Sequence, residues 1–152
     1  MVELAIALPL LLFIILGIIE FGVMFGNYLE LGNVAREGAR SAALGSNTSI
    51  VTSRIYTTAT NVGMVSANDI TSTLEYRVYD KNTHVWTGWS TLTNDRSGYN
   101  SAPCDEDYDS QVRVTVSYKY PLVTGGFFGT IIGNDGKINL TASSVMRREE
   151  TP

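Results

Sequence analysis

The N-terminal segment constrains this chain most, because residues 4–25 are 22 consecutive positions with a single charged side chain, Glu20. At about 1.5 Å per residue, a helix of this length spans the roughly 30 Å hydrocarbon layer of a bilayer. A helix that is apolar on every side fits lipid or a packed protein interior rather than a soluble surface. We therefore expect a helical stem, inserted in a membrane or packed in a filament.

The helical pattern continues past this segment, and we predict one long helix from about Val2 to Leu44. From Asn27 onward the pattern is amphipathic. The apolar stripe consists of Leu31, Val34, Ala35, Gly38 and Ala42, and the polar residues are Asn33, Arg36, Glu37 and Arg40. Gly45 is expected to follow the end of the helix. Pro9 removes one helical hydrogen bond, which predicts a kink or local loosening near residues 5–9.

Glycines recur along the predicted stem, at Gly17, Gly22, Gly26 and Gly32. Small residues let the backbones of neighbouring helices approach closely, and Gly22 and Gly26 have the four-residue spacing of a helix-contact face. This spacing favours packing against another helix. The alternative is that membrane helices simply tolerate glycine.

The rest of the chain predicts a small β-rich head. A short second helix is expected over residues 49–62, with Gly63 as its stop, although the threonines in it weaken the pattern. Alternating residues predict strands at 73–79, 84–89, 111–120 and 137–146, with a turn at 80–83. Residues 92–109 are rich in Gly, Asn, Ser and Asp and are interpreted as a long surface loop.

The strand over residues 111–120 has the clearest pattern. Val112, Val114, Val116 and Tyr118 share one face, and Arg113, Thr115, Ser117 and Lys119 share the other. The predicted fold class is therefore α+β, type IV pilin-like: a long N-terminal hydrophobic helix followed by a head with a three- or four-stranded antiparallel sheet packed on the upper helix. We expect residues 1–45 to form the stem and residues 46–152 the head.

Charge and composition exclude several classes of function. The net charge of −4 argues against nucleic acid as a partner, because no basic stripe would neutralise phosphates. The single cysteine, Cys104, cannot form an internal disulfide. His84 has no histidine or cysteine partner for a metal, and we find no nucleophile–base pair and no phosphate-binding loop. We therefore expect no enzymatic activity and no cofactor.

Other polar and aromatic groups have two interpretations each. Four carboxylates lie within five positions, at Asp105, Glu106, Asp107 and Asp109. Carboxylate oxygens are the ligands that Ca²⁺ prefers, but these residues lack the spacing of a known calcium loop. A solvated acidic loop is therefore our first interpretation. Core or cross-strand packing is favoured over an adhesive surface for the aromatic residues Tyr76, Tyr79, Trp86 and Trp89. Asn47 and Asn139 begin short motifs that match glycosylation acceptors.

Three segments together resemble one family. They are VELAIALPLLL at residues 2–12 leading to GIIEFG at 17–22, NVAREGARSAA at 33–43, and LTASSVMRRE at 140–149. In combination they are similar to TadE-like proteins, the pilin-related class of the tight-adherence secretion and pilus systems. The resemblance is close over the first 45 residues, loose over the last strand and tail, and weak in between.

The resemblance implies an inner-membrane precursor that a prepilin peptidase trims and passes to a pilus assembly machine. Subunits would then leave the bilayer for a cell-surface filament. The implied function is a structural pilin-like subunit that polymerises with copies of itself through the N-terminal helix. The alternative is a minor pseudopilin or assembly component that stays in the inner membrane and primes assembly. An isolated single-span adaptor, which would stay monomeric, is a third interpretation.

The resemblance also implies a role for the chain's first residues. In type IV pilin-like filaments, a glutamate near the N-terminus is thought to neutralise the N-terminal amine of a neighbouring subunit. Glu3 and the amine of Met1 would fill these roles, with an interfacial glutamate as the alternative. The family's glutamate usually stands at the fifth mature position. The mature chain therefore starts differently here, or about two residues precede Met1.

Glu20 needs a partner or a proton in a filament, because an isolated charge is costly in an apolar environment. Arg36, the nearest basic residue in sequence, is roughly 24 Å further along the helix. We therefore expect a partner from another subunit, and a plain interfacial position is the alternative. Arg36, Glu37 and Arg40 have the spacing of helix pairs and form either a solvated face or a registration contact. The predicted assembly residues are Met1, Glu3, Pro9, Gly17, Glu20, Gly22, Gly26, Arg36, Glu37 and Arg40.

Overall fold

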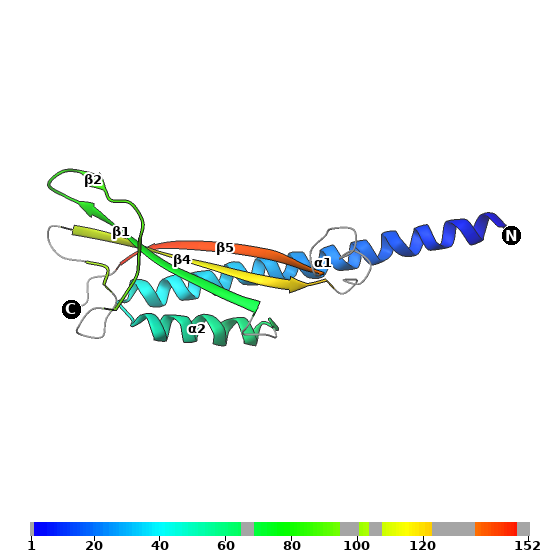
Figure 1. Cartoon of the computed structure of the whole chain (residues 1–152), viewed down its shortest axis with the longest axis horizontal. Helices are drawn as coiled ribbons and strands as arrows, with labels where there is room; N and C mark the ends of the chain where they lie inside the picture. Colours follow the sequence, from blue (N-terminus) through cyan, green and yellow to red (C-terminus); the bar gives the residue numbers. More distant parts are fainter. Residues whose placement is uncertain (1, 65–68, 95–100, 104–107, 123–135, 149–152) are drawn as a thin grey trace.

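The computed structural model describes residues 2–64, 69–94, 101–103, 108–122 and 136–148, without the side chains of residues 2–6 and 108. One long helix, α1, forms the axis of the molecule. Its N-terminal half projects alone, and its C-terminal half lies against a second helix and a curled antiparallel sheet (Figure 1). The predicted α+β fold, a long apolar helix followed by a β-rich head, is confirmed.

Helix α1 runs from Val2 to Ala43, about 63 Å at 1.5 Å per residue. The prediction of one continuous helix is confirmed, and its end differs by one residue. The helix continues without a break through Pro9. Gly45 follows the end of the helix, as expected, and has φ of 80°. The amide of Gly45 donates to the Ala42 carbonyl and the amide of Ser46 donates to the Ser41 carbonyl, the two hydrogen bonds of a Schellman cap.

Helix α2 runs from Thr48 to Asn61, so the short second helix is also confirmed. The side chain of Asn47 accepts a hydrogen bond from the Ser49 amide and caps the start of the helix. Gly63, with φ of 85°, follows the end, and the Met64 amide donates to the Ala59 carbonyl. The threonine hydroxyls that weakened the prediction bond back to carbonyls about one turn earlier, for example Thr52 to Thr48.

The sheet is antiparallel, with the strand order β2-β1-β4-β5 and β3 paired to β1. Three long strands carry it: β1 from Ile70 to Asp80, β4 from Tyr108 to Pro121, and β5 from Lys137 to Arg147. The expected strand over 84–89 is wrong in extent, because the ladder forms only at β2, Val85–Trp86, and at β3, Ser90–Thr91. Between them the Thr87 hydroxyl, rather than a backbone carbonyl, accepts the hydrogen bond from the Val78 amide.

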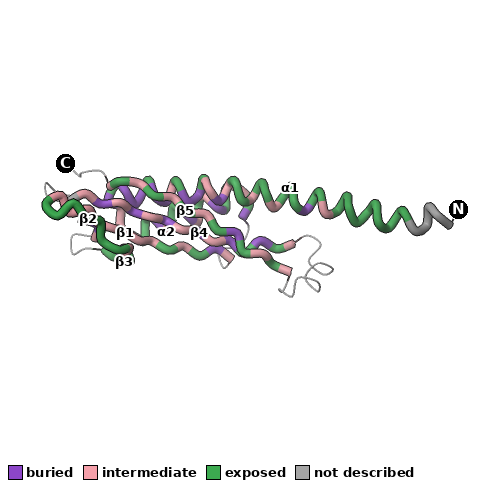
Figure 2. Tube along the Cα trace, turned by 90° about the horizontal axis from the view of Figure 1, so that it is seen from above, coloured by how far each residue is buried: buried purple, intermediate pink, exposed green. Residues whose placement is uncertain are grey.

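The core lies between the inner face of the sheet, the C-terminal half of α1, and α2. On β4 the even-numbered residues from Val112 to Tyr120 are buried, which confirms the predicted alternation. All five residues of the apolar stripe on α1 are buried too. Figure 2 shows the same distribution, with buried residues gathered where α1 meets the sheet and α2. The upper part of the stem and the head therefore share one hydrophobic core.

The interpretation of residues 92–109 as a surface loop is wrong at several described positions. Leu92 and Ala102 are buried in the core, and the Leu92 amide donates to the Leu74 carbonyl. The strand β4 already begins at Tyr108. Burial of these two apolar side chains anchors the described parts of the segment to the head, a long-range effect that a polar composition does not reveal.

Candidate assembly surface on the stem

The projecting half of α1 presents bulky apolar side chains on every side. Each of them is between 41% and 68% exposed; they are Leu8, Leu10, Leu11, Leu12, Phe13, Ile14, Ile15, Leu16, Ile18, Ile19, Phe21, Val23 and Phe25. Soluble monomers rarely expose a contiguous apolar surface of this extent, and such surfaces mark contacts with lipid or protein. The helix is long and apolar enough to cross a membrane. The stem therefore requires a partner surface.

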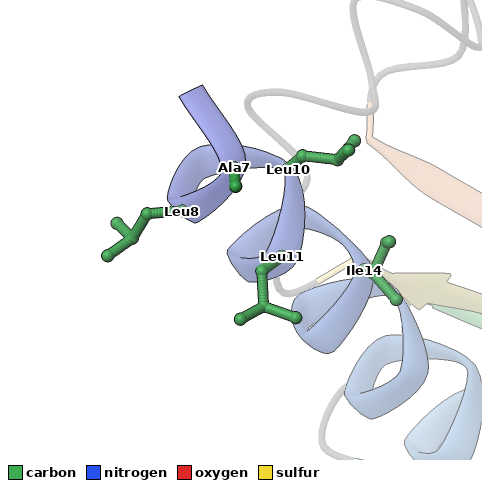
Figure 3. A pocket seen from close by; sticks show the side chains of 5 residues that line it. All are labelled: Ala7, Leu8, Leu10, Leu11 and Ile14. Atoms are coloured by element: carbon green, nitrogen blue, oxygen red, sulfur yellow. The ribbon is translucent and has the colours of Figure 1, made fainter. Parts of the chain in front are cut away.

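A shallow hollow of about 370 Å³ lies on this half of the helix, lined by Ala7, Leu8, Leu10, Leu11 and Ile14. Figure 3 shows Leu8 and Leu10 pointing to opposite sides of the helix. The lining is almost wholly apolar and belongs to one convex helix. It is part of the exposed stem surface and has no polar groups to orient a small molecule.

The stem glycines have open space around them. A Cβ built on Gly17, Gly22 or Gly26 would meet no atom within 4 Å. Within the chain, nothing described packs closely against these positions. Close approach of another helix there stays a prediction, as does the effect of Pro9 on the stem.

Glu20 is the first buried side chain along the described part of the stem, and only 6% of it is exposed. It lies where the end of β4 reaches α1, next to Tyr120. Burial raises the pKa of the Tyr120 hydroxyl, and the nearby Glu20 carboxylate raises it further. The two groups are close neighbours, although the hydroxyl makes no hydrogen bond of standard geometry within the described residues. Spacing along the helix does not reveal this neighbour, because Tyr120 lies 100 positions away in the sequence, on β4.

The polar residues higher on α1 make contacts other than the expected ones. Arg36 donates to the Asn33 side chain at 3.1 Å. Glu37 pairs with Arg54 of α2 at 3.3 Å, a partner 17 positions away that helical spacing does not reveal. Arg40 is exposed. An exposed ion pair of this kind contributes little to stability, and a role in subunit registration stays a prediction.

The acidic group of the predicted loop is described only at Asp109. Its carboxylate lies 2.7 Å from the Arg147 guanidinium and 3.5 Å from the Lys81 ammonium. The hydrogen bond from Arg147 is the main reason that the pKa of Asp109 is lowered. Asp105, Glu106 and Asp107 lie outside the described residues. In the described part of the chain no group of three carboxylate, histidine or cysteine side chains could hold a metal ion.

The aromatic residues of the head include one cross-strand pair of the kind we expected. Tyr79 is opposite Trp86 in the register, with ring centroids 5.1 Å apart. The surrounding arginines were not foreseen: Arg77 lies 4.5 Å from the Trp86 ring centroid and 4.8 Å from that of Trp89, and Arg113 lies 4.2 Å from Trp89. With guanidinium groups against these rings, the cluster ties the β2–β3 segment to the sheet.

The remaining predicted site residues have simple positions. Met1 and the side chain of Glu3 lie outside the described residues. Asn47 caps α2 and Asn139 is exposed on β5, opposite Lys119. His84 is exposed, has a φ of 56°, and contacts the Tyr79 hydroxyl at 3.1 Å through Nδ1. Glycosylation at either asparagine stays a prediction.

Comparison with family models matches residues 1–40 to the family described as TadE-like protein. These residues are the exposed stem and the part of α1 that carries Glu20, Arg36 and Arg40. Over this segment the chain is similar to TadE-like proteins. Neither the curated proteins nor the solved structures contain a match to it. The TadE-like segment associates the chain with tight-adherence pilus systems, a structural and not an enzymatic setting, and with their assembly machinery in general.

Proposed function

We propose that this TadE-like chain is a structural subunit that polymerises through its N-terminal helix into an extracellular pilus filament. Before assembly the same helix holds the subunit in the inner membrane. In the filament, stems of neighbouring copies cover one another and the heads form the outer surface. A prepilin peptidase and the pilus assembly machinery act on the chain between these two states.

The observation that supports this proposal most strongly is the exposed apolar surface of α1 between Leu8 and Phe25. The head covers α1 only from Glu20 onward, so the chain alone leaves about half of its longest element uncovered. Burial of apolar area is worth about 25 cal/mol per Å², so the stem gains stability in any environment that removes it from water. A bundle of identical stems is such an environment.

The second candidate is a minor pseudopilin that remains in the inner membrane and primes assembly of another pilin. An exposed apolar stem with a folded head suits this role as well. The two roles differ in what surrounds the stem: many copies of the same chain in the first, lipid and a few copies of a different chain in the second.

Photo-crosslinking in pilus-producing cells tests the proposal. A benzophenone amino acid at Ile18, which is 67% exposed, is expected to give a ladder of multiples of the chain. The same probe at the exposed Thr57 of α2 is the control and should give a much weaker ladder. Glu3→Ala should abolish the ladder while membrane insertion survives. Crosslinks from Ile18 only to lipid or to one different protein would favour the second candidate.

A further inference from the structure

The base of the head, the end of the sheet nearest the projecting stem, carries a group of residues that the assembly role does not use. It consists of the end of β4 and the start of β5, where Lys119 is opposite Asn139 and Pro121 is opposite Lys137. In Figure 1 this end of both strands lies where α1 leaves the head. Tyr120 places it at the level of Glu20.

The length of free stem below this base equals one bilayer. Residues 2–19 of α1 precede Glu20 and measure about 27 Å, against roughly 30 Å for a hydrocarbon layer. All described side chains from Ala7 to Ile19 are exposed except the half-buried Gly17. When this segment spans the membrane, no described residue of the stem separates the lipid from the head. The base of the head then lies in the layer of lipid headgroups.

Both ends of the sheet carry charged side chains. Lys119 and Lys137 lie on exposed positions at the base, and Lys137 is partly balanced by Asp69 at 2.7 Å. At the opposite end of the strands, around the β1–β2 turn, Asp109 is balanced by Lys81 at 3.5 Å and Arg147 at 2.7 Å. At the base, which is the end that would meet the membrane, the exposed cations are Lys119 and Lys137. Lysines in this position attract anionic lipids and keep their ammonium groups in the headgroup layer.

We infer that, before assembly, the base of the head rests on the membrane and that Lys119 and Lys137 bind the phosphate groups of anionic phospholipids. The contact fixes how deeply the stem is inserted, with Glu20 and Tyr120 at the boundary between hydrocarbon and headgroups. It is independent of filament formation, because it requires only the inserted monomer. The partner is a lipid surface and not a soluble anion, since the stem delivers the lysines to the membrane.

Depth measurements on the full chain in nanodiscs test the position of the base. In a Cys104→Ser background, fluorophores are attached at Asn139→Cys and, as the matched control, at Val145→Cys on the same exposed face of β5. The two positions are about 20 Å apart at 3.4 Å per residue. A quencher on the lipid headgroups should quench the probe at position 139 several-fold more strongly than the probe at 145. Equal quenching at both positions would overturn the inference.

Lipid selectivity tests the role of the lysines. Native mass spectrometry of the full chain from equimolar phosphatidylglycerol and phosphatidylcholine should show a preference for phosphatidylglycerol of roughly fivefold, as expected for surface lysines. Lys119→Gln/Lys137→Gln should lower the preference to near unity, and Lys119→Arg/Lys137→Arg should retain it. The control Arg54→Gln/Lys81→Gln removes two charges away from the base and should change little. A preference that survives the glutamine double variant would overturn the inference.

Discussion

Ile55 of α2 packs against Gly38 of α1 so closely that a Cβ on Gly38 would lie 2.7 Å from Ile55 Cγ1. The same Cβ would lie 3.1 Å from a methyl group of Val114 on β4. Gly38 is thus the point where α1, α2 and the sheet meet with no room for a side chain. Ile55 and Val114 are fully buried, so neither can move toward solvent.

Gly38→Ala is therefore expected to destabilise the head. Alanine favours helix by about 1 kcal/mol over glycine, but overpacking a tight core typically costs about 1–3 kcal/mol. We expect a net loss of about 1 kcal/mol in the free energy of unfolding, measured by urea denaturation in detergent. Gly32→Ala is the matched control, because its Cβ would meet no atom within 4 Å, and it should be neutral or stabilising. Equal stability of the two variants would contradict the packing described.

Trp89 is expected to hold the β2–β3 segment on the sheet, because the guanidinium groups of Arg77 and Arg113 lie 4.8 Å and 4.2 Å from its ring centroid. Trp89→Leu keeps an apolar side chain and removes both cation–π contacts. The expected loss is about 1–2 kcal/mol in the free energy of unfolding. Val85→Ala, at a side chain that is 60% exposed in the same segment, should change little. If both variants melt at the same temperature, the contacts with Trp89 contribute nothing.

Alkaline pH should destabilise the base of the head. Burial raises the pKa of both Tyr118 and Tyr120 above the ordinary value of 10.0. The unfolded chain then loses the phenolic protons at lower pH than the folded chain. The stability that these groups contribute is complete below the unfolded pKa and is lost as pH rises through the folded pKa.

The measurement is the free energy of unfolding across about pH 9 to 11, together with phenolate absorbance. Tyr118→Phe/Tyr120→Phe should flatten the decline. Glu20→Gln should lower the raised pKa of Tyr120 part of the way toward its ordinary value, because the carboxylate charge is removed while the burial of Tyr120 remains. An unchanged Tyr120 titration in Glu20→Gln would show that the two side chains do not interact.

Local patterns predicted the elements of this fold well. The alternation in β4 and the glycines after both helices are set by neighbouring residues, and the structure places them as expected. Composition alone predicted the stem, because 22 consecutive positions with a single charged side chain are compatible with few structures other than an apolar helix. These features depend on periodicities of 2.0 and 3.6 residues, which are readable in a single sequence.

The contacts of the candidate site were not predictable in the same way. Glu20 and Tyr120 are 100 positions apart, and Glu37 and Arg54 lie on different helices. Whether an arginine lies over a tryptophan ring depends on sheet register, which strand patterns alone leave open. The expected strand over 84–89 was wrong in extent because a threonine hydroxyl replaces one backbone acceptor between β2 and β3.

Quantitative composition of purified surface filaments tests the central claim most directly. Filaments sheared from cells, inspected by electron microscopy and analysed by peptide mass spectrometry, should contain this chain as their most abundant subunit. The Glu3→Ala strain should yield none while the chain remains in the inner membrane. Filaments that contain the chain only in trace amounts, or that form normally without it, would contradict the proposal that it polymerises through its stem.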